Sequence, residues 1–255
     1  LSDSAAVKGN ERMVSVVADA IRDRERALRD DLVVGFGLAR LRISVAQSRG
    51  IVREARRRYR RHNAGRRYVE REFFAALAAS HHSQPDHDNV RHRLRRDSRV
   101  LEALERMWPV LTPAQLLRDL FGSKALIASA AGEHFSEEES LTLFRPRGES
   151  LSDYRWSDAD VALLDEAYSG LGPRLDRQRK ARDPEIRTFG HIVVDETQDH
   201  TPMALRMISR RSLNGSMTLV GDIAQATAPG AAANWDEVLN YMPTGASEHR
   251  VRELT

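Results

Sequence analysis

The chain of 255 residues contains no cysteine, and this absence excludes disulfide bonds and metal sites built on thiolates. It also contains no apolar run close to the roughly 20 residues that a membrane-spanning helix requires. No signal peptide opens the sequence, because its first residues lack a basic region followed by an apolar one. These absences predict a soluble protein of a reducing cytoplasm, without a membrane partner.

Lysine is scarce, because it occurs only as Lys8, Lys124 and Lys180. None of the three belongs to a Gly-x-x-x-x-Gly-Lys-Ser/Thr run, the loop whose backbone amides and lysine hold nucleotide phosphates. The sequence therefore lacks a phosphate-binding loop of this type.

Charge of one sign does not dominate the composition. Lys and Arg number 40 and Asp and Glu 37, so the formal net charge of +3 indicates no particular partner. A chain of this length can bury one sizeable core and a satellite domain. The positions of the charges are more informative than their sum.

The most informative stretch is an apolar run that ends in acids. His191 to Val194 predicts a short buried parallel strand, and Asp195 and Glu196 follow it directly. Ligands of open α/β sheets bind at the carboxyl ends of such strands. Asp195 is suited to hold Mg²⁺ there, and Glu196 to activate a water for attack on a nucleotide phosphate. The alternative is an ordinary helix start, because acids favour the first turn of any helix.

The segments that follow predict the remainder of a βαβ unit. Residues 203–213 carry helical apolar spacing between a Thr-Pro start and an Asn-Gly end, and residues 217–220 form a strand pattern that runs into Gly221 and Asp222. Because the crossover in such a unit is right-handed, we expect Asp195 and Asp222 at the same edge of one sheet.

Two motifs carry a resemblance. Asp195-Glu196-Thr197-Gln198-Asp199 and Gly221-Asp222-Ile223-Ala224-Gln225 resemble the DExxD and GDxxQ motifs of the UvrD/Rep group of superfamily 1 helicases. Within that group, residues 221–227 and 235–239 are most similar to the HelD family of helicase-like ATPases that bind bacterial RNA polymerase. The Arg-rich and Ala-rich composition suggests an actinobacterial member.

The resemblance implies ATP and Mg²⁺ as cofactors and a role for each motif residue. It implies that Asp195 coordinates Mg²⁺, that Glu196 is the catalytic base and that Gln225 senses the γ-phosphate. The cofactor-binding edge would include Asp222 and Gln198 beside Asp195. Asp222 would anchor the turn that carries Gln225, and Gln198 and Asp199 would link the two motifs by hydrogen bonds rather than perform chemistry.

The implied fold class is α/β, part of a RecA-like parallel-sheet domain that carries a large, mainly α-helical insertion. The first portion of the RecA-like domain would cover residues 1–31, the HelD-specific insertion with a small β-hairpin 32–110, a helical extension and linker 111–187, and the RecA-like part with both motifs 188–255. The family carries its phosphate loop upstream and a second RecA-like domain downstream. We therefore expect a fragment of a longer ATPase, which alone does not hydrolyse ATP.

The GDxxQ motif departs from the helicase pattern after Gln225. Translocating members continue with an aromatic residue and an arginine that handle single-stranded DNA, whereas Ala226 and Thr227 follow here. We expect ATP hydrolysis to serve something other than duplex unwinding. The resemblance implies binding to the RNA polymerase core, removal of nucleic acid and recycling of the enzyme, with a UvrD/Rep-type DNA helicase or translocase as the alternative.

Arginines concentrate between Arg49 and Arg71, in a region that also carries Tyr59 and Tyr68. One interpretation is a nucleic-acid-binding helical domain, in which arginines meet the phosphates of DNA or RNA and tyrosines stack on bases. The other is a solvated helix face with Tyr59 packed inward, since glutamates interrupt the run. The candidate contact residues are Arg53, Arg57, Arg60, Arg61 and Arg67.

The remaining patterns predict further elements. The His-rich stretch 80–88 is typical of a solvated connector rather than of a metal site, because its spacing matches no rigid ligand set. We also expect helices over 11–30 and 88–108, a hairpin within 32–43, a capping box formed by Ser44 and Gln47, a linker over 170–187 and a strand over 249–254.

Overall fold

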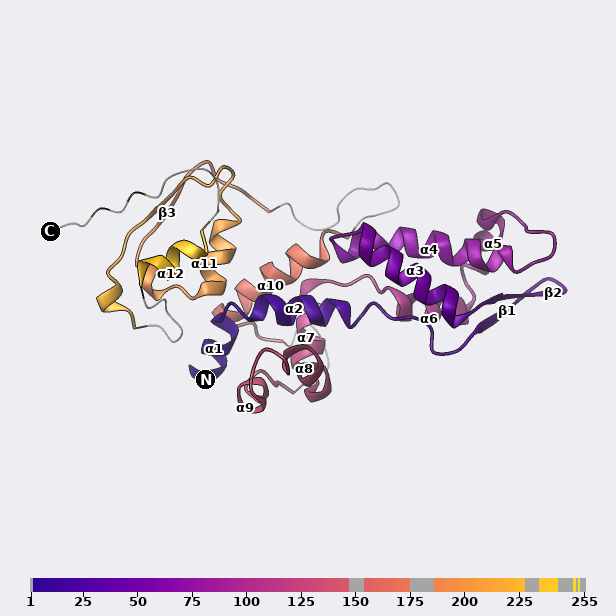
Figure 1. Ribbon diagram of the computed structural model, residues 1–255, viewed down its shortest axis with the longest axis horizontal. Helices are drawn as coiled ribbons and strands as arrows, with labels where there is room; N and C mark the ends of the chain where they lie inside the picture. Colours follow the sequence, from indigo (N-terminus) through magenta and orange to yellow (C-terminus); the bar gives the residue numbers. More distant parts are fainter. Residues whose placement is uncertain are drawn as a thin grey trace.

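The computed structural model describes residues 2–146, 154–174, 186–227, 234–242, 250 and 252. Within these residues lie twelve α-helices and two two-stranded sheets, one of them parallel. Figure 1 shows an elongated molecule, with an antiparallel hairpin at one end, the parallel strands at the other and helices between them. The chain is mainly helical. The described residues contain no parallel sheet of the size expected for a RecA-like domain.

The middle of the molecule, which we call the central lobe, packs around one hydrophobic core that includes Met13, Val17, Leu116, Phe121 and Leu163. Its helices are α1 (Ser2–Gly9), α2 (Met13–Arg22), α7 (Pro113–Phe121), α8 (Lys124–Ala131), α9 (Glu137–Leu141) and α10 (Asp158–Leu171).

A second core, around Phe73, Phe74 and Trp108, forms the distal lobe between α2 and α7. Its elements are β1 (Leu32–Phe36), β2 (Ala39–Ile43), α3 (Val45–Arg58), α4 (His62–Ala79), α5 (His87–Leu94) and α6 (Ser98–Met107). The strands β1 and β2 are antiparallel, and a two-residue turn joins Phe36 to its partner Ala39.

The third part, which we call the αβ lobe, has a small core of Leu205, Val238 and Met242. It contains β3 (Ile192–Val194), α11 (Pro202–Ser209), β4 (Met217–Leu219) and α12 (Trp235–Asn240), with short 3-10 helices at Thr197–Asp199 and Ile223–Gln225. Strands β3 and β4 are parallel, and α11 connects them. This arrangement is the βαβ unit predicted from the sequence.

The chain passes twice between the central and distal lobes, and these passes form a neck. His62 at the start of α4 is buried there, with its Nδ1 3.0 Å from Glu25 Oε1 and its Nε2 2.7 Å from the Pro109 carbonyl oxygen. Its ring stacks on Trp108, with 4.9 Å between centroids and 5° between planes. Glu25 and Pro109 belong to the two passing segments, so His62 joins them.

Local sequence signals predicted several elements correctly. The hairpin is confirmed, and Ser44 and Gln47 form the expected capping box. The helix over 11–30 is wrong beyond Arg22, because the Arg26 amide donates instead to the Met107 carbonyl across the neck. The helix over 88–108 is also wrong, since Asp97 caps a new helix and so separates α5 from α6.

Three smaller differences concern the ends of the chain and the linker. A helix, α1, occupies residues 2–9, where no motif was recognised. Helix α10 runs into the expected linker and ends at Gly172, whose φ of 70° suits glycine. Residues 175–185 of that linker, and the strand expected over 249–254 apart from Arg250 and Arg252, lie outside the described residues. No described helix is both long enough and apolar enough to span a membrane.

Candidate functional site

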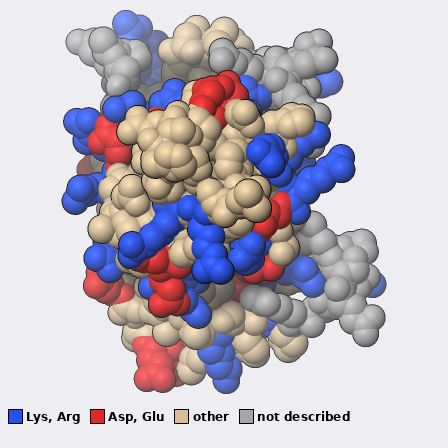
Figure 2. Space-filling view, turned by 90° about the vertical axis from the view of Figure 1, so that its right-hand side faces the viewer, with Lys and Arg blue, Asp and Glu red and all other residues tan. Residues whose placement is uncertain are grey.

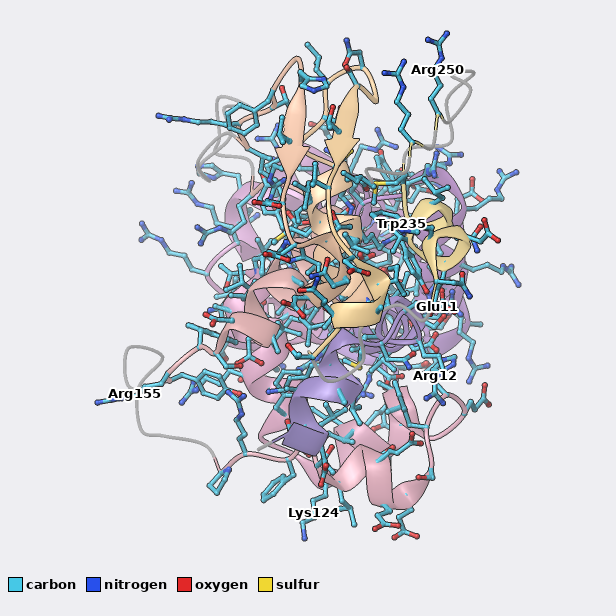
Figure 3. All side chains as sticks on the ribbon, turned by 90° about the vertical axis from the view of Figure 1, so that its left-hand side faces the viewer. Glu11, Arg12, Lys124, Arg155, Trp235 and Arg250 are labelled. Atoms are coloured by element: carbon cyan, nitrogen blue, oxygen red, sulfur yellow. The ribbon has the colours of Figure 1, made fainter. Side chains whose placement is uncertain are left out.

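The parallel pairing of β3 and β4 brings the two acidic motifs to one edge of the αβ lobe. Ile192 is in register with Met217 and Val194 with Leu219, so the residues after both strands emerge together. The Val220 amide donates to the Val194 carbonyl over 2.8 Å, and the Thr197 amide donates to the Val220 carbonyl over 3.0 Å. Figure 3 faces this end of the molecule, with the two strands side by side.

Gln198 connects the two motifs. Its side chain is buried, its Nε2 donates to Glu196 Oε2 over 2.7 Å, and its Oε1 accepts the Asp222 amide over 3.0 Å. A single amide therefore orients the carboxylate of the first motif and fixes the backbone of the second. Gln198 is buried behind the acidic residues, so it can position Glu196 and Asp222 but cannot itself contact a ligand.

Gly221 permits this close approach. A Cβ atom built there would lie 2.2 Å from Gln198 Oε1 and 3.0 Å from the Thr197 amide nitrogen. Backbone cannot give way as a flexible side chain can, so any side chain at this position would push the two motifs apart.

The second motif is held by short-range hydrogen bonds. Asp222 accepts the Ala224 amide over 2.9 Å through Oδ1, and Gln225 Nε2 donates to its Oδ2 over 3.0 Å. Asp199 of the first motif accepts both the Thr227 amide and its hydroxyl through Oδ1, over 3.1 and 3.2 Å. Asp199 thus ties the turn after Gln225 to the end of the other strand.

Glu196 has an unusual backbone. Its φ of 47° and ψ of 44° lie in the left-handed region, which glutamate rarely adopts. Non-glycine residues in this region carry strain and cluster at functional sites. The conformation directs the chain abruptly out of β3, and it leaves the Glu196 side chain exposed beside Asp195.

The donor set suits a hydrated Mg²⁺ ion. Asp195 is exposed and its Oδ1 accepts the Glu196 amide over 2.9 Å, which fixes the carboxylate at the edge of the strand. Mg²⁺ keeps several waters and commonly binds one or two carboxylates together with nucleotide phosphates. Asp195 fits such a carboxylate ligand, and Glu196 is placed to contact a water beside it.

One face of the parallel sheet is uncovered. Leu205 of α11 and Val238 of α12 belong to the core on the other side, where Met217 and Leu219 pack against them. On the open side Val193 exposes 66% of its surface, and Phe189 and Leu213, in the segments that precede the two strands, expose 52% and 73%. Within the described part of the chain no further strand pairs with β3 or β4.

Ion pairs join the αβ lobe to the central lobe. Asp165 and Glu166 on α10 are buried, and they bind Arg206, Arg210 and Arg211 at the end of α11. The αβ lobe is therefore held by the helix that connects its two strands.

The arginines proposed to contact nucleic acid do not share one environment. Arg57 donates to Glu54 through two nitrogens, over 3.0 and 2.7 Å, and is thus engaged within the chain. Arg53, Arg60, Arg61 and Arg67 are exposed. The tyrosines are not free to stack on bases, because Tyr68 is buried beneath Arg58 and Arg71, at 4.9 and 5.3 Å from its ring. The interpretation of Tyr68 as a stacking platform is therefore wrong. Tyr59 is half-buried and packs against the Tyr68 ring, with 5.9 Å between centroids.

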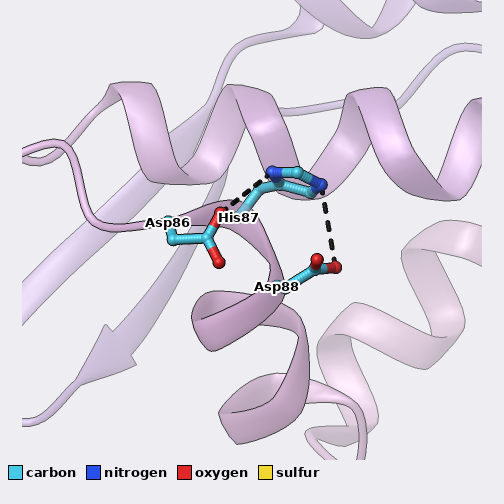
Figure 4. A group of neighbouring side chains, drawn as sticks. All are labelled: Asp86, His87 and Asp88. Carbon is cyan, nitrogen blue, oxygen red and sulfur yellow. Dashed lines mark ion pairs between the residues drawn. The ribbon is translucent and has the colours of Figure 1, made fainter.

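One cluster of possible metal ligands lies far from this edge, in the connector before α5 and at the start of that helix. Within the described residues, only Asp86, His87 and Asp88 form a group of three or more such side chains within reach of one another. His87 lies between the two carboxylates, 3.3 Å from Asp86 and 3.7 Å from Asp88 (Figure 4). Both aspartates are largely exposed, so the cluster is a solvated arrangement of charges.

Sequence reasoning missed Thr197 and the acids of α10. Thr197 is buried, and its hydroxyl donates to the Val220 carbonyl over 2.9 Å, which closes the edge between the strands. The position of Thr197 inside the first motif could have indicated that it contributes to the site. Asp165 and Glu166 carried no such signal, because their partners lie 40 to 46 residues away in the sequence. No protein-family model matches the chain, and no curated protein matches it at a significant level.

Proposed function

We propose that the chain is part of a HelD-like ATPase that binds the RNA polymerase core and uses ATP to clear nucleic acid from it. In this proposal the αβ lobe belongs to a RecA-like domain, whose remaining strands pair with the free edges of β3 and β4 and whose remaining helices cover the exposed face at Val193. Asp195 holds Mg²⁺, Glu196 activates the attacking water and Gln225 senses the γ-phosphate.

The observation that carries the proposal is the bridge made by Gln198. It joins the Glu196 carboxylate to the Asp222 backbone, so the two motifs form one structure although 26 positions separate these residues in the sequence. Two acidic motifs that only resembled a nucleotide site by chance would have no reason to share a buried amide. The left-handed Glu196 supports the same assignment.

The turn after Gln225 favours polymerase recycling over strand separation. Thr227 is tied to Asp199 by two hydrogen bonds, and Ala226 carries neither a ring nor a charge. The position from which a helicase would contact single-stranded DNA is therefore used to close the edge itself. Duplex unwinding by the parent protein would contradict this assignment.

Capture of the RNA polymerase core by the purified chain tests the partner. We expect capture that survives a rise in salt from about 0.1 to about 0.3 M, since a protein interface with an apolar centre is screened less than phosphate contacts are. DNA that occupies the main channel should compete. Absence of capture at the lower salt concentration would refute the polymerase assignment.

A further inference from the structure

The end of the distal lobe presents an apolar residue that the fold does not require. Gly37 and Leu38 form the turn between β1 and β2, and Gly37 has a φ of 62°. A two-residue hairpin turn with a positive φ at its first position is of the II′ type, which makes no demand for a large apolar residue at the second. Leu38 is nevertheless fully exposed at the apex, at 111% of its reference surface.

Arginines surround this apex. The segment from Arg91 to Arg96 carries four arginines and a histidine without an intervening acid. Arg93 lies over the Phe36 ring, 4.5 Å from its centroid. Arg40, Arg95 and Arg96 are exposed and have no ion-pair partner among the described residues. Figure 2 faces this end of the molecule, and basic side chains form a band across its middle.

The helix α3 offers a contrast. Arg57 and Arg58 both bind Glu54, and their hydrogen bonds lower the pKa of that carboxyl to about 2. Part of the basic run noted in the sequence is therefore compensated within the chain. The guanidinium groups of Arg40, Arg95 and Arg96 are available to an external anion.

We propose that this distal end, formed by Leu38, Arg40, Arg93, Arg95 and Arg96, binds the phosphate backbone of a nucleic-acid duplex, with Leu38 directed at the groove. This inference goes beyond the ATPase and polymerase assignment and does not depend on it. Arginines beside a protruding apolar residue match the way that minor-groove proteins hold a bent duplex, with cations on phosphates and an apolar wedge against a base step.

Two features favour a duplex over other polyanionic partners. A protein interface relies on buried aromatic or aliphatic anchors, and the large apolar residues that the hairpin and α6 expose are Leu38, Val33 and Leu101 alone, without an aromatic ring. A single strand requires exposed rings for stacking, whereas Phe36 next to the turn lies beneath Arg93 and packs edge-on against the His81 ring, 6.4 Å away. A line of phosphates therefore suits the charges best.

Salt-dependent binding of a labelled DNA duplex to the full chain, followed by fluorescence anisotropy, tests the proposal. With about four phosphates neutralised, the logarithm of affinity should fall against the logarithm of salt with a slope of about −3.6. The double variant Arg95→Gln/Arg96→Gln should reduce that slope by about 1.8 and weaken binding roughly tenfold or more at low salt. Leu38→Ser should weaken binding with the slope unchanged.

The charge-matched control is Arg53→Gln/Arg57→Gln on α3, which we expect to leave both affinity and slope within about twofold of the original protein. All of these positions are exposed, so equal thermal unfolding of the variants would exclude misfolding. An equal loss of slope in the control would place the contact on α3 and overturn the proposal. Absence of duplex binding would also overturn the proposal. So would a result in which the distal variants lose binding to an acidic protein and the original protein binds no duplex.

Discussion

At the scale of single residues, the candidate site depends on how closely two backbone segments approach each other. Gln198 is enclosed between them, and Gly221 is the residue whose missing side chain leaves room for it. The acidic residues that would perform chemistry are exposed, so their substitution costs little stability. The residues that position them, such as Gln198, are buried. Stability measurements are therefore sensitive to the integrity of the edge even when no nucleotide is bound.

Gly221→Ala should separate the motifs, because its Cβ would lie 2.2 Å from Gln198 Oε1. We predict a loss of roughly 2 kcal/mol or more in the free energy of unfolding, from strain and from an unsatisfied Asp222 amide. Urea unfolding monitored by far-UV circular dichroism measures it. Gly190→Ala is the control, since a Cβ there meets nothing within 4 Å. Equal stability of the two variants would contradict the geometry of the edge.

At the scale of elements, sequence signals succeeded where the deciding interaction is local. The capping boxes at Ser44 and Thr112 connect residues three positions apart, so the starts of α3 and α7 could be predicted. The end of α2 and the break before α6 could not be predicted in the same way. The first is set by a hydrogen bond to Met107 in another lobe, and the second by Asp97, which lies inside the helix predicted over 88–108 but caps α6.

In the candidate site too, local sequence patterns predicted some features, whereas contacts between distant residues determine others. The strand patterns and the order of the motifs predicted that Asp195 and Asp222 emerge at one edge, because a right-handed crossover allows little else. The left-handed backbone of Glu196 and the anchoring of α11 by Asp165 depend on contacts distant in sequence. No pattern in a single sequence reports such contacts.

Two glycines in the helices of the distal lobe provide a matched test of its packing. Gly65 in α4 faces Trp108, and a Cβ there would lie 2.8 Å from the indole ring. Gly50 in α3 would place a Cβ in open space. We predict that Gly65→Ala destabilises the protein by about 1–3 kcal/mol, whereas Gly50→Ala stabilises it by about 0.5–1 kcal/mol through helix propensity. Thermal unfolding of both variants measures the difference, and a stable Gly65→Ala protein would contradict the α4–Trp108 contact.

The contact between α1 and α10 should make stability depend on acid. Lys8 Nζ and Asp160 Oδ1 form a buried ion pair of 2.8 Å. Burial opposes ionisation of Asp160, but hydrogen bonds from Lys8 and Ser157 outweigh it and hold the pKa of this carboxyl below its ordinary value. Its contribution is therefore fully present above the unfolded pKa of about 3.9 and is lost as the pH falls through the lower folded pKa.

We predict that Asp160→Asn removes this part of the acid dependence and destabilises the protein by roughly 3–5 kcal/mol at neutral pH, because the buried Lys8 loses its carboxylate partner. Urea unfolding between about pH 3 and pH 7 measures both effects. Asp158→Asn, an exposed position in the same helix, should retain the acid dependence. If the two variants lose the same acid dependence, the buried pair is not its source.

At the scale of the whole molecule, three lobes are joined by few but polar connections. The Asn63 side chain binds the backbone of Leu111 and Gly172 through three hydrogen bonds of 2.9–3.1 Å, and so links α4 to one passing segment of the neck and to the end of α10. The αβ lobe is attached through α11 and its arginines. The candidate nucleotide edge and the proposed duplex-binding end lie at opposite ends of this arrangement (Figure 1).

Steady-state ATP hydrolysis tests the central assignment most directly. The assays would compare this chain alone with the longer ATPase proposed to contain it, both in the original form and as Glu196→Gln. We expect no turnover by the chain alone, because it has no phosphate-binding loop. In the longer protein, Glu196→Gln should lower kcat by about 10²–10⁴-fold, as loss of a catalytic base does. Turnover that Glu196→Gln leaves unchanged, or Glu196-dependent hydrolysis by this chain alone, would contradict the assignment.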